Sequence, residues 1–566
     1  MKLRCILASR PSIVALAASI ISASNVMATT YYVKPGGGTT GGTSWATAFG
    51  SPQRALEVAT ENDEIWVAAG TYVPTNAETP DPRSRTFRLK RGVKLYGGFI
   101  GTEPELNGLE LRNPAIHLTT LSGDINGDDG ANFANRGDNA YHVIYAKWFE
   151  NFDPNCVPNC PVIKIQDTTQ LDGFVIRGGA ATGTGGEGLN EGASDAFGGG
   201  ALVIASAPVF QNCLFTDNLA TNGGGGHTSG LAGAAIPGGA DPANPKFISC
   251  SFTRNRANIS GGGHSNSHDT TNFLNCSFSN NDAVEDGGAL FNFAGGLLRV
   301  KRINVLNCSF SVNYAPVGSA ISNGGKAYVH NSIIWGNLPS TEPQIHTVTG
   351  EPIFTDINYS DCLGCPLLGI GNRDDDPQFV NPSIDNLRLD IDSDCRNRGH
   401  VSDVLDDDPD PFPPDVYDVN NDEDTQEEAP DRDRLTRVIP DNAIDMGAYE
   451  VDSPTSCCGD LNSDGIVNVT DLLIVVTTWT QAGPADIAPA CGGDGIVNVS
   501  DLLKVVDLWG ACPGVEPPPG GIAGIPQSYY DCGDLCAGLS GQSWSECMAG
   551  CFEILCKQGQ TEFCLD

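Results

Sequence analysis

The stretch Asn275-Cys276-Ser277-Phe278-Ser279-Asn280-Asn281 decides the fold of this chain, because its pattern returns along the sequence with the same internal offsets. Each copy has a cysteine, a phenylalanine two residues later and an asparagine three residues after that. Other copies begin at Asn212, Ser249 and Asn307, and a degenerate copy with serine in place of cysteine begins at Asn331. The gaps between copies contain glycine steps and vary in length. Fixed offsets with variable gaps predict a solenoid whose coils repeat their wall positions and vary their loops.

The alternation inside the repeat indicates short strands rather than helices. Cys213 and Phe215 would both point inward from one strand, and coils stacked about 4.8 Å apart would place cysteine on cysteine and phenylalanine on phenylalanine. The asparagine at the bend can satisfy backbone groups and bond to the coil above. Short helical periods are absent, and the gaps are too irregular for propeller blades. The sequence therefore predicts an all-β parallel β-helix over residues 29–450.

Two resemblances support this fold class. The Phe-x-x-Asn copies, with Gly-Gly-Ala-Leu at 199–202 and 287–290, resemble the repeats of polymorphic outer-membrane proteins, which implies a right-handed β-helix of the pectin-lyase-like type displayed on a cell surface. The chain has no terminal run of amphipathic membrane strands of the kind that would export such a passenger. Residues 331–337, 376–380, 386–389 and 445–450 resemble the C-terminal part of choice-of-anchor β-helix proteins, which carry surface-attachment modules downstream.

The cysteine column is predicted to be a ladder of small buried side chains rather than a set of metal or catalytic thiols. No histidine keeps register with the cysteines. His264 and His268, with Asp269, sketch a zinc site as the alternative, but they are expected in a loop rich in glycine, serine and asparagine. At the entry, an amphipathic helix over 51–60 is expected to cover the first coil, followed by one strand over 63–72.

Composition and targeting signals place the protein outside the cell. Residues 1–28 have a basic start, an apolar stretch and a small-residue cleavage site, which is typical of a signal peptide. No later segment is apolar for long enough to suggest a membrane span. The formal charge of -37 disfavours nucleic acid as a partner and favours calcium. The stretch 403–433 holds 14 acidic residues and is expected to be a solvated insert or a weak calcium contact.

Calcium loops are predicted in residues 455–513. In the first loop side-chain and carbonyl oxygens fall at the spacing that wraps one Ca²⁺ ion. Its ligands are Asp460, Asn462, Asp464, Ile466, Asn468 and Asp471. The second loop lacks side-chain ligands at two positions and is predicted to be weaker. Its ligands are Asp494, Ile496, Asn498 and Asp501, with Asp486 returning through a longer loop.

Each loop leads into an apolar stretch, and the tandem resembles a type I dockerin. That resemblance implies two helices that bury each other and a face that binds a cohesin domain. By position, the partner-binding residues are Val469, Thr470, Val499 and Ser500. Valine at the first of these positions in each copy departs from the family pattern, so the partner is a cohesin-like or other surface protein. A calcium-stiffened cap without a partner is the alternative.

A linker rich in proline and glycine, residues 514–530, leads to a cysteine-rich tail over 531–566. Cysteines four apart lie on one face of a helix, which suits a helical hairpin cross-linked as Cys532 to Cys551 and Cys536 to Cys547. In an exported protein disulfides are favoured over zinc. Cys362 with Cys365, and Cys156 with Cys160, are further candidates for local disulfides.

Two functions remain open from the sequence. The favoured one is a secreted or cell-surface β-helix protein with a non-catalytic binding, adhesive or structural role, attached through the calcium module. The alternative is a polysaccharide lyase or glycoside hydrolase acting on an acidic polysaccharide, which needs carboxylates and a basic residue on one outer wall. The basic residues of the repeat region look scattered and aligned with no carboxylate pair. They are Arg177, Lys246, Arg254, Arg256, Arg299, Lys301 and Arg302.

Overall fold

The computed structural model describes residues 28–104, 108–109, 111–147, 165, 168–183, 195–204, 206–229, 244–267, 270–293, 301–348, 354–365, 369–390, 392–400, 431–432 and 444–450, and a few positions beyond these: 466–467, 472, 475, 502, 505 and 510–511. The predicted signal peptide, most of the acidic insert and the cysteine-rich tail lie outside the described residues.

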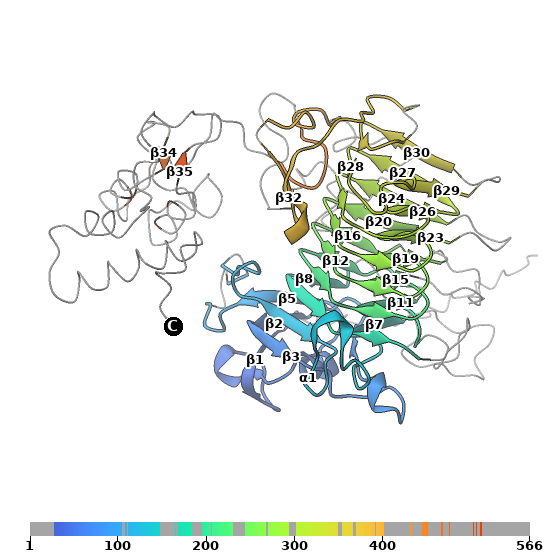
Figure 1. The fold of residues 1–566 in the computed structure, drawn as a ribbon. Helices are drawn as coiled ribbons and strands as arrows, with labels where there is room; N and C mark the ends of the chain where they lie inside the picture. Colours follow the sequence, from blue (N-terminus) through green and yellow to red (C-terminus); the bar gives the residue numbers. More distant parts are fainter. Residues whose placement is uncertain are drawn as a thin grey trace, which may run out of the picture.

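The strands form stacked parallel sheets that run along one axis (Figure 1). Sheet 1 contains β1 (Thr30–Gly38), β2 (Glu64–Ala68), β5 (Lys94–Phe99), β8 (Gln170–Asp172), β12 (Val209–Gln211), β16 (Lys246–Ile248), β20 (Thr270–Leu274), β24 (Arg302–Leu306), β27 (Lys326–His330) and β30 (Phe354–Asn358). Sheet 2 contains β3 (Gly70–Tyr72), β6 (Thr119–Ser122), β9 (Phe174–Arg177), β13 (Leu214–Thr216), β17 (Ser251–Thr253), β21 (Ser277–Ser279), β25 (Ser309–Ser311), β28 (Ile333–Ile334) and β31 (Asp361–Cys362).

The return path of the coils forms two further parallel sheets, the second of which spans four coils. Sheet 3 contains β4 (Phe87–Arg88), β7 (Ile144–Lys147), β11 (Ala201–Ile204), β15 (His227–Ser229), β19 (His264–Asn266), β23 (Leu290–Asn292), β26 (Ile321–Asn323) and β29 (Ile345–Thr347). Sheet 4 contains β10 (Ala180–Ala181), β14 (Leu219–Ala220), β18 (Arg256–Ala257) and β22 (Asp282–Ala283). The chain passes through sheets 1, 2 and 3 in turn and rises one strand per coil, and four coils also have a sheet 4 strand between sheets 2 and 3. The predicted parallel β-helix is therefore confirmed. Its handedness stays a prediction.

The register is the one that the repeat predicts. Phe215, Phe252, Phe278 and Phe310 are cross-strand partners in sheet 2, and their rings stack with centroids 4.8, 4.8 and 4.6 Å apart. Each pair adds aromatic attraction of about 1 kcal/mol to the burial of its area. The side chains are completely buried. A one-residue slip would turn the whole column toward solvent, so this packing specifies the register.

The cysteine column is a buried structural ladder, as predicted. Cys213, Cys250, Cys276 and Cys308 are free thiols with no exposed surface. Each thiol donates to a backbone carbonyl, for example Cys276 to the oxygen of Phe247 at 3.3 Å. Burial raises the pKa of three of these thiols well above the ordinary value, so they remain protonated and unreactive.

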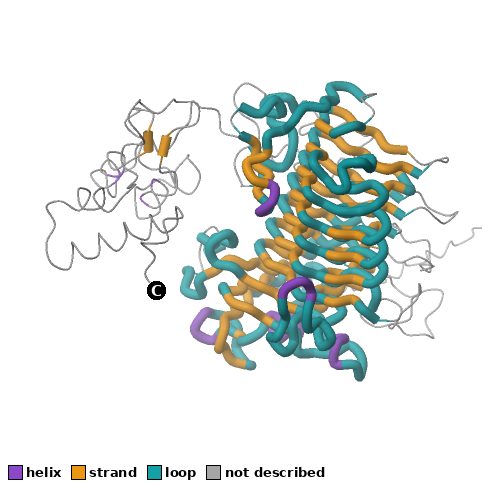
Figure 2. Tube along the Cα trace, viewed as in Figure 1, coloured by secondary structure: helices purple, strands orange, loops and turns teal. Residues whose placement is uncertain are grey.

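The entry of the solenoid differs in part from the expectation. The helix α1 (Pro52–Val58) forms as predicted, capped by the Ser51 hydroxyl, which accepts from the Gln53 amide at 3.2 Å. It packs against the strands of the first coil. The single strand predicted over 63–72 is wrong: the chain bends at Ala69, and its halves β2 and β3 belong to sheets 1 and 2. Short 3-10 turns lie at Trp45–Thr47, Pro82–Ser84, Ala131–Phe133 and Pro382–Ile384 (Figure 2).

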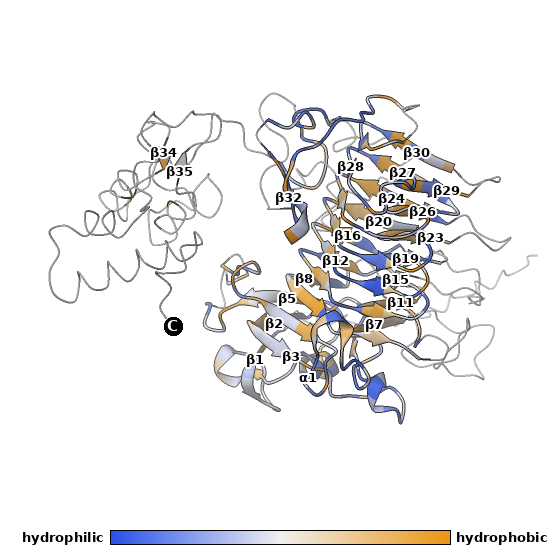
Figure 3. Cartoon of the chain, in the orientation of Figure 1, coloured by the Kyte–Doolittle hydropathy of each residue, from blue (hydrophilic) through white to orange (hydrophobic). Residues whose placement is uncertain are grey.

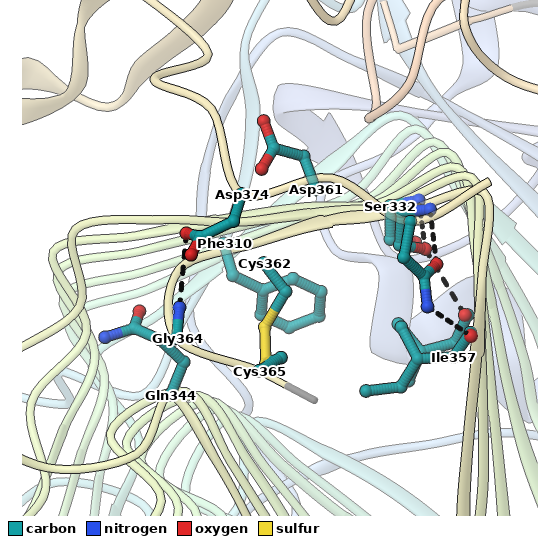
Figure 4. Close-up of a disulfide and its surroundings, with 12 residues drawn as sticks. Phe310, Ser332, Gln344, Ile357, Asp361, Cys362, Gly364, Cys365 and Asp374 are labelled. Carbon is teal, nitrogen blue, oxygen red and sulfur yellow. Dashed lines mark hydrogen bonds between the residues drawn. A yellow bond between two sulfur atoms is a disulfide. The ribbon is translucent and has the colours of Figure 1, made fainter. Parts of the chain in front are cut away.

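A disulfide lies at the last strand of sheet 2. Cys362 continues the column of Phe310 and Ile334, and it forms a disulfide with Cys365, which confirms that candidate pair. Figure 4 shows the bridge beside the Phe310 ring, with Ile357 and Gln344 around it. Cys156 and Cys160 lie outside the described residues.

The end of the solenoid domain folds back along the outside of sheet 2. Strands β32 (Phe379–Asn381) and β33 (Asn386–Leu389) form an antiparallel hairpin. The amide of Gly447 donates to the Asn331 carbonyl at 2.7 Å, and the amide of Ala448 donates to the Ser309 hydroxyl at 2.9 Å. Residues 444–450 therefore lie against the outer wall of the last coils.

Two histidines stack inside the solenoid, a pairing that the sequence pattern does not predict. His227 and His264 are cross-strand partners in sheet 3, with ring centroids 4.9 Å apart and Nδ1 atoms 2.8 Å apart. Both are fully buried, and neither Nε2 atom has a hydrogen-bond partner among the described residues. His264 thus belongs to the core and not to the predicted metal loop, while His268 and Asp269 lie outside the described residues. Figure 3 shows β15 and β19 as hydrophilic strands within the stack.

We predict that replacing this pair stabilises the protein. Burial lowers the pKa of His264 from 6.5 to about 3 and that of His227 well below its ordinary value. Between these values only the unfolded chain takes up the proton, so the free energy of unfolding falls as pH drops below about 6.5. The double variant His227→Leu/His264→Leu extends the column of Leu290 and Ile321 and should gain about 1–3 kcal/mol at pH 7.

Urea unfolding at pH 7 and pH 5 measures both effects. The double variant should lose less stability on acidification than the wild type, whereas His117→Leu, at a half-buried histidine outside the core, should leave the difference unchanged. A double variant less stable than the wild type at both pH values would show that the histidine pair stabilises the fold.

Candidate functional site

The predicted calcium and partner residues lie almost entirely outside the described residues. In that region β34 (Ile466–Val467) pairs antiparallel with β35 (Gly510–Ala511). Leu472, Val475, Leu502 and Val505 are helical, and both valines are fully buried. These four positions follow the two predicted loops, and the rest of each predicted helix lies outside the described residues. The ligand geometry, the partner face and the predicted disulfides Cys532–Cys551 and Cys536–Cys547 stay predictions.

A groove of about 580 Å³ on the outer wall of the solenoid is the candidate site. It lies beside the bend between sheets 2 and 4, with the loop between β6 and β7 as its other wall. Its lining residues are Asp129, Gly130, Ala131, Asn132, Phe133, Arg136, Arg177, Asp217, Arg254, Arg256, Asn280 and Asp282. Four arginines, three aspartates, two amides and one aromatic ring thus face one space.

The floor of the groove comes from variable positions of the repeat. Asp217, Arg254 and Asn280 occupy the same place on three successive coils, with φ of 53°, 51° and 55°. Each precedes a buried ladder asparagine, so this left-handed residue lies at the outside of the bend. Two residues further along the coil, Arg256 and Asp282 are cross-strand partners in sheet 4. The core motif leaves these positions free to carry functional side chains.

The loop wall is tied to the floor by a buried polar cluster. The Asn139 amide donates to the Asp129 carboxylate at 3.1 Å and to the Gly178 carbonyl at 2.6 Å. Asp129 also pairs with Arg136 at 3.0 Å, with side chains only 5% and 7% exposed. The Arg136 guanidinium lies over the Phe133 ring, 5.4 Å from its centroid. These contacts fix the wall against the coil that carries Gly178.

Phe133 is held in an unusual backbone conformation. Its φ is 60°, and its neighbours Asn132 and Asn135 have φ of 55° and 62°. The left-handed region is common for asparagine but costly for a bulky side chain, and strain of this kind concentrates at functional sites. The ring is half-buried at the rim of the groove.

Ion pairs organise the charges of the floor. Arg254 lies 3.5 Å from Asp217, and Arg256 lies 3.5 Å from Asp282. Burial raises the pKa of Asp282, and the charge of Arg256 opposes this rise. Burial likewise raises the pKa of Asp129 and lowers that of Arg136. In the described part of the chain, Arg177 makes no ion pair and is exposed, so its guanidinium can bind a ligand.

Three carboxylates gather in the same loop, with oxygens within 4.8 Å of one another: Asp124, Asp128 and Asp138. Asp124 accepts the amides of Gly127 and Asp128 at 2.7 and 3.2 Å, and Asp138 accepts the amide of Asn126 at 3.2 Å. These bonds hold the carboxylates of Asp124 and Asp138 against the backbone of the loop wall.

The expectation that the basic residues are scattered and align with no carboxylate is wrong for three of them. Arg177, Arg254 and Arg256 come together on neighbouring coils with Asp217 and Asp282. The sequence carries a usable signal, because the residues that flank the ladder asparagines face outward and can be compared copy by copy. The contribution of the β6–β7 loop carries no such signal, since it lies outside the repeat.

No protein-family model and no curated protein matches this chain. Among solved structures it is similar to a pectin methylesterase from carrot (10% identity, 62% of this chain and 84% of that chain, TM-score 0.31) and to a rhamnogalacturonan lyase (12% identity, 62% and 91%, TM-score 0.29). It is also similar to XylC in complex with xylose (11% identity, 62% and 87%, TM-score 0.23). At these scores the similarities say nothing about activity. Among the described residues no helix is both long and apolar enough to cross a membrane.

We predict that the loop wall depends on the Asp129–Arg136 pair. Removing one partner leaves a charge buried without compensation, which costs about 3–5 kcal/mol, while removing both costs less than the sum. Urea unfolding of Arg136→Met, Asp129→Asn and the double variant measures the coupling between the two residues. Additive losses would show that the two charges are independently solvated.

Proposed function

We propose that this chain is an extracellular β-helix protein that binds a polysaccharide strand in the groove and does not cleave it. The observation that best supports this proposal is that five charged side chains on adjacent coils line one groove: Arg177, Arg254, Arg256, Asp217 and Asp282. Guanidinium and carboxylate groups are planar and can bind two neighbouring hydroxyl groups of a sugar at once. The Phe133 ring at the rim offers an apolar face for a sugar ring.

The pairing of the acidic groups supports binding over catalysis. Each carboxylate that lines the groove has a guanidinium within 3.5 Å: Asp129 has Arg136, Asp217 has Arg254 and Asp282 has Arg256. A neighbouring guanidinium stabilises the charged carboxylate and opposes proton uptake. General acid–base catalysis needs a carboxyl group that exchanges its proton near the working pH. At Asp129 and Asp282 burial outweighs the effect of the neighbouring guanidinium and raises the pKa. The preference for recognition over proton transfer therefore rests on the ion pairs that occupy the three carboxylates.

A polysaccharide lyase or glycoside hydrolase is the second candidate. It is favoured by the same convergence, because such an enzyme needs carboxylates and basic residues on one outer wall. In this alternative Arg177, which makes no ion pair with a described carboxylate, would approach the substrate. The two candidates differ in one measurable result, which is the appearance of new chain ends.

Attachment through the calcium module completes the proposal. The ligand spacing from Asp460 to Asp471 supports one firm Ca²⁺ site, and the loop that ends at Asp501 supports a weaker one. A loop-and-helix tandem of this kind would hold the β-helix on a cohesin-like or other surface protein. The signal peptide predicted over residues 1–28 and the Cys362–Cys365 disulfide support an extracellular location.

We predict that Arg177→Gln weakens polysaccharide binding about tenfold, the cost of one charge-assisted hydrogen bond. The measurement is calorimetric titration with a panel of soluble acidic and neutral polysaccharides. Arg91→Gln, at a half-buried arginine paired with Glu61 in the entry coils, is the control and should bind as the wild type does. The same mixtures are assayed for reducing and unsaturated ends. Sustained release of such ends would reject the non-catalytic proposal and support the second candidate.

We predict that the full-length protein binds one Ca²⁺ ion firmly and a second weakly. Asp460→Asn with Asp471→Asn should abolish the firm site, because each change removes a charged oxygen ligand. Calorimetric titration after treatment with EDTA measures the stoichiometry. The control Asp390→Asn with Asp392→Asn removes an equal charge at two exposed carboxylates and should leave both sites intact. Firm binding that survives the double variant would place the calcium elsewhere.

A further inference from the structure

The tip of the β32–β33 hairpin reaches the end of the candidate groove. The hairpin lies along the outer face of the solenoid, with β32 beside the stacked coils (Figure 1) and β33 in contact with β25. Between its strands the 3-10 turn Pro382–Ile384 ends at Asp385, whose φ is 66°. This left-handed conformation turns the chain at the point where the hairpin meets the row of Asp217, Arg254 and Asn280 at the bend.

The Asp385 carboxylate is held there by three donors from two successive coils. The Arg254 guanidinium forms an ion pair with it, the Ser279 hydroxyl donates at 2.6 Å and the Asn280 amide donates at 2.7 Å. The Asp385 side chain is 19% exposed. We call Arg254, Ser279 and Asn280 the carboxylate seat. A guanidinium, a hydroxyl and an amide around one carboxylate make a charge-assisted recognition site.

The seat is continuous with the groove. Arg254 and Asn280 belong to the seat and also line the groove, so the Asp385 carboxylate stands at the groove's end. Arg254 is shared between Asp385 and Asp217, the latter at 3.5 Å. On the coil before Asp217, Arg177 is exposed and is the cross-strand partner of Thr216. A strand along the solenoid axis would therefore meet a guanidinium near Arg177 and another at the seat.

We infer that the seat is a carboxylate subsite of the groove, that the bound polysaccharide is a polyuronate, and that Asp385 is an internal competitor for the sugar carboxylate. This inference rests on the proposed function, since it names the ligand class of the same groove. The protein's own carboxylate shows what the seat accepts. A ligand carboxylate enters the seat when the hairpin tip lifts, and the apparent affinity is reduced by the fraction of time that Asp385 occupies it.

The alternative is that Asp385 only anchors the hairpin. The two roles predict opposite effects of removing its carboxylate. An anchor stabilises the groove end, so its loss weakens binding or leaves it unchanged, whereas the loss of a competitor strengthens binding to a polymer with carboxylates.

The test compares Asp385→Ala with Asp390→Ala in the full-length protein, by calorimetric titration at fixed salt. Asp390 is an exposed carboxylate at the end of β33, so its removal makes the same change in net charge away from the seat. The probes are polygalacturonate, its methyl-esterified form and dextran sulfate. We expect Asp385→Ala to bind polygalacturonate about tenfold more tightly than the wild type and Asp390→Ala to match the wild type. The methyl-esterified polymer should show no gain.

Two further variants keep the result decisive. Arg254→Gln added to Asp385→Ala should abolish the gain, because it removes the cation of the seat. If Asp385→Ala unfolds at a lower temperature, Asp385→Asn keeps the side-chain size and the accepting oxygen, and it should show a smaller gain.

The outcomes separate this inference from the proposed function. Wild-type binding without a gain in either Asp385 variant would overturn the competitor and leave the groove as a binding site. An equal gain with dextran sulfate would overturn the polyuronate assignment, because the seat would then accept any anion. No binding of any polymer by the wild type or by the Asp385 variants would reject the proposed function itself, and the inference with it.

Discussion

The rest of the structure depends on a ladder of buried asparagine side chains. The Asn281 amide nitrogen donates to the Phe252 carbonyl at 2.8 Å and to the Asn313 side chain at 2.9 Å. Its oxygen accepts from the Asn255 backbone and side chain at 3.2 and 3.0 Å. Both donors and both lone pairs are used, so the buried amide carries no unsatisfied group. Because every bond runs to a neighbouring coil, the ladder sets the register of one coil on the next.

The ladder also explains where the groove lies. It extends from the Gly179 amide, which donates to Asn218 at 3.0 Å, to the Gln344 side chain, which accepts from Asn337 at 2.9 Å. Each ladder asparagine turns inward at the bend, which leaves the residue before it at the outside of the turn. Repeated over adjacent coils, this arrangement converts unrelated positions in the sequence into a row of outward side chains. Arg254, which serves both the groove and the carboxylate seat, is one member of that row.

The repeat predicts which side chains face the interior of the solenoid, but it says little about which outward side chains form a site. Burial constrains the cysteine, phenylalanine and asparagine columns, so their recurrence predicted both the strands and the register. The earlier coils fill the interior with other apolar residues, such as Ile176 and Leu121, and carry no motif by which to count them. The floor of the groove draws on outward-facing side chains, where burial does not dictate the residue type, and its loop wall lies outside the repeat. The hairpin that brings Asp385 to the seat depends on contacts between segments more than 100 residues apart in the chain, which no local spacing reveals.

Equilibrium unfolding of Asn281→Ala tests most directly whether the ladder holds the coils in register. The variant leaves the Asn255 donors, the Phe252 carbonyl and the Asn313 oxygen buried with fewer partners, so it should lose about 3 kcal/mol or more of stability. Asn258→Ala, at an exposed asparagine of the neighbouring coil, should stay within about 0.5 kcal/mol of the wild type. Equal stability of Asn281→Ala and the wild type would contradict the account, because the coils would then keep their register without the ladder.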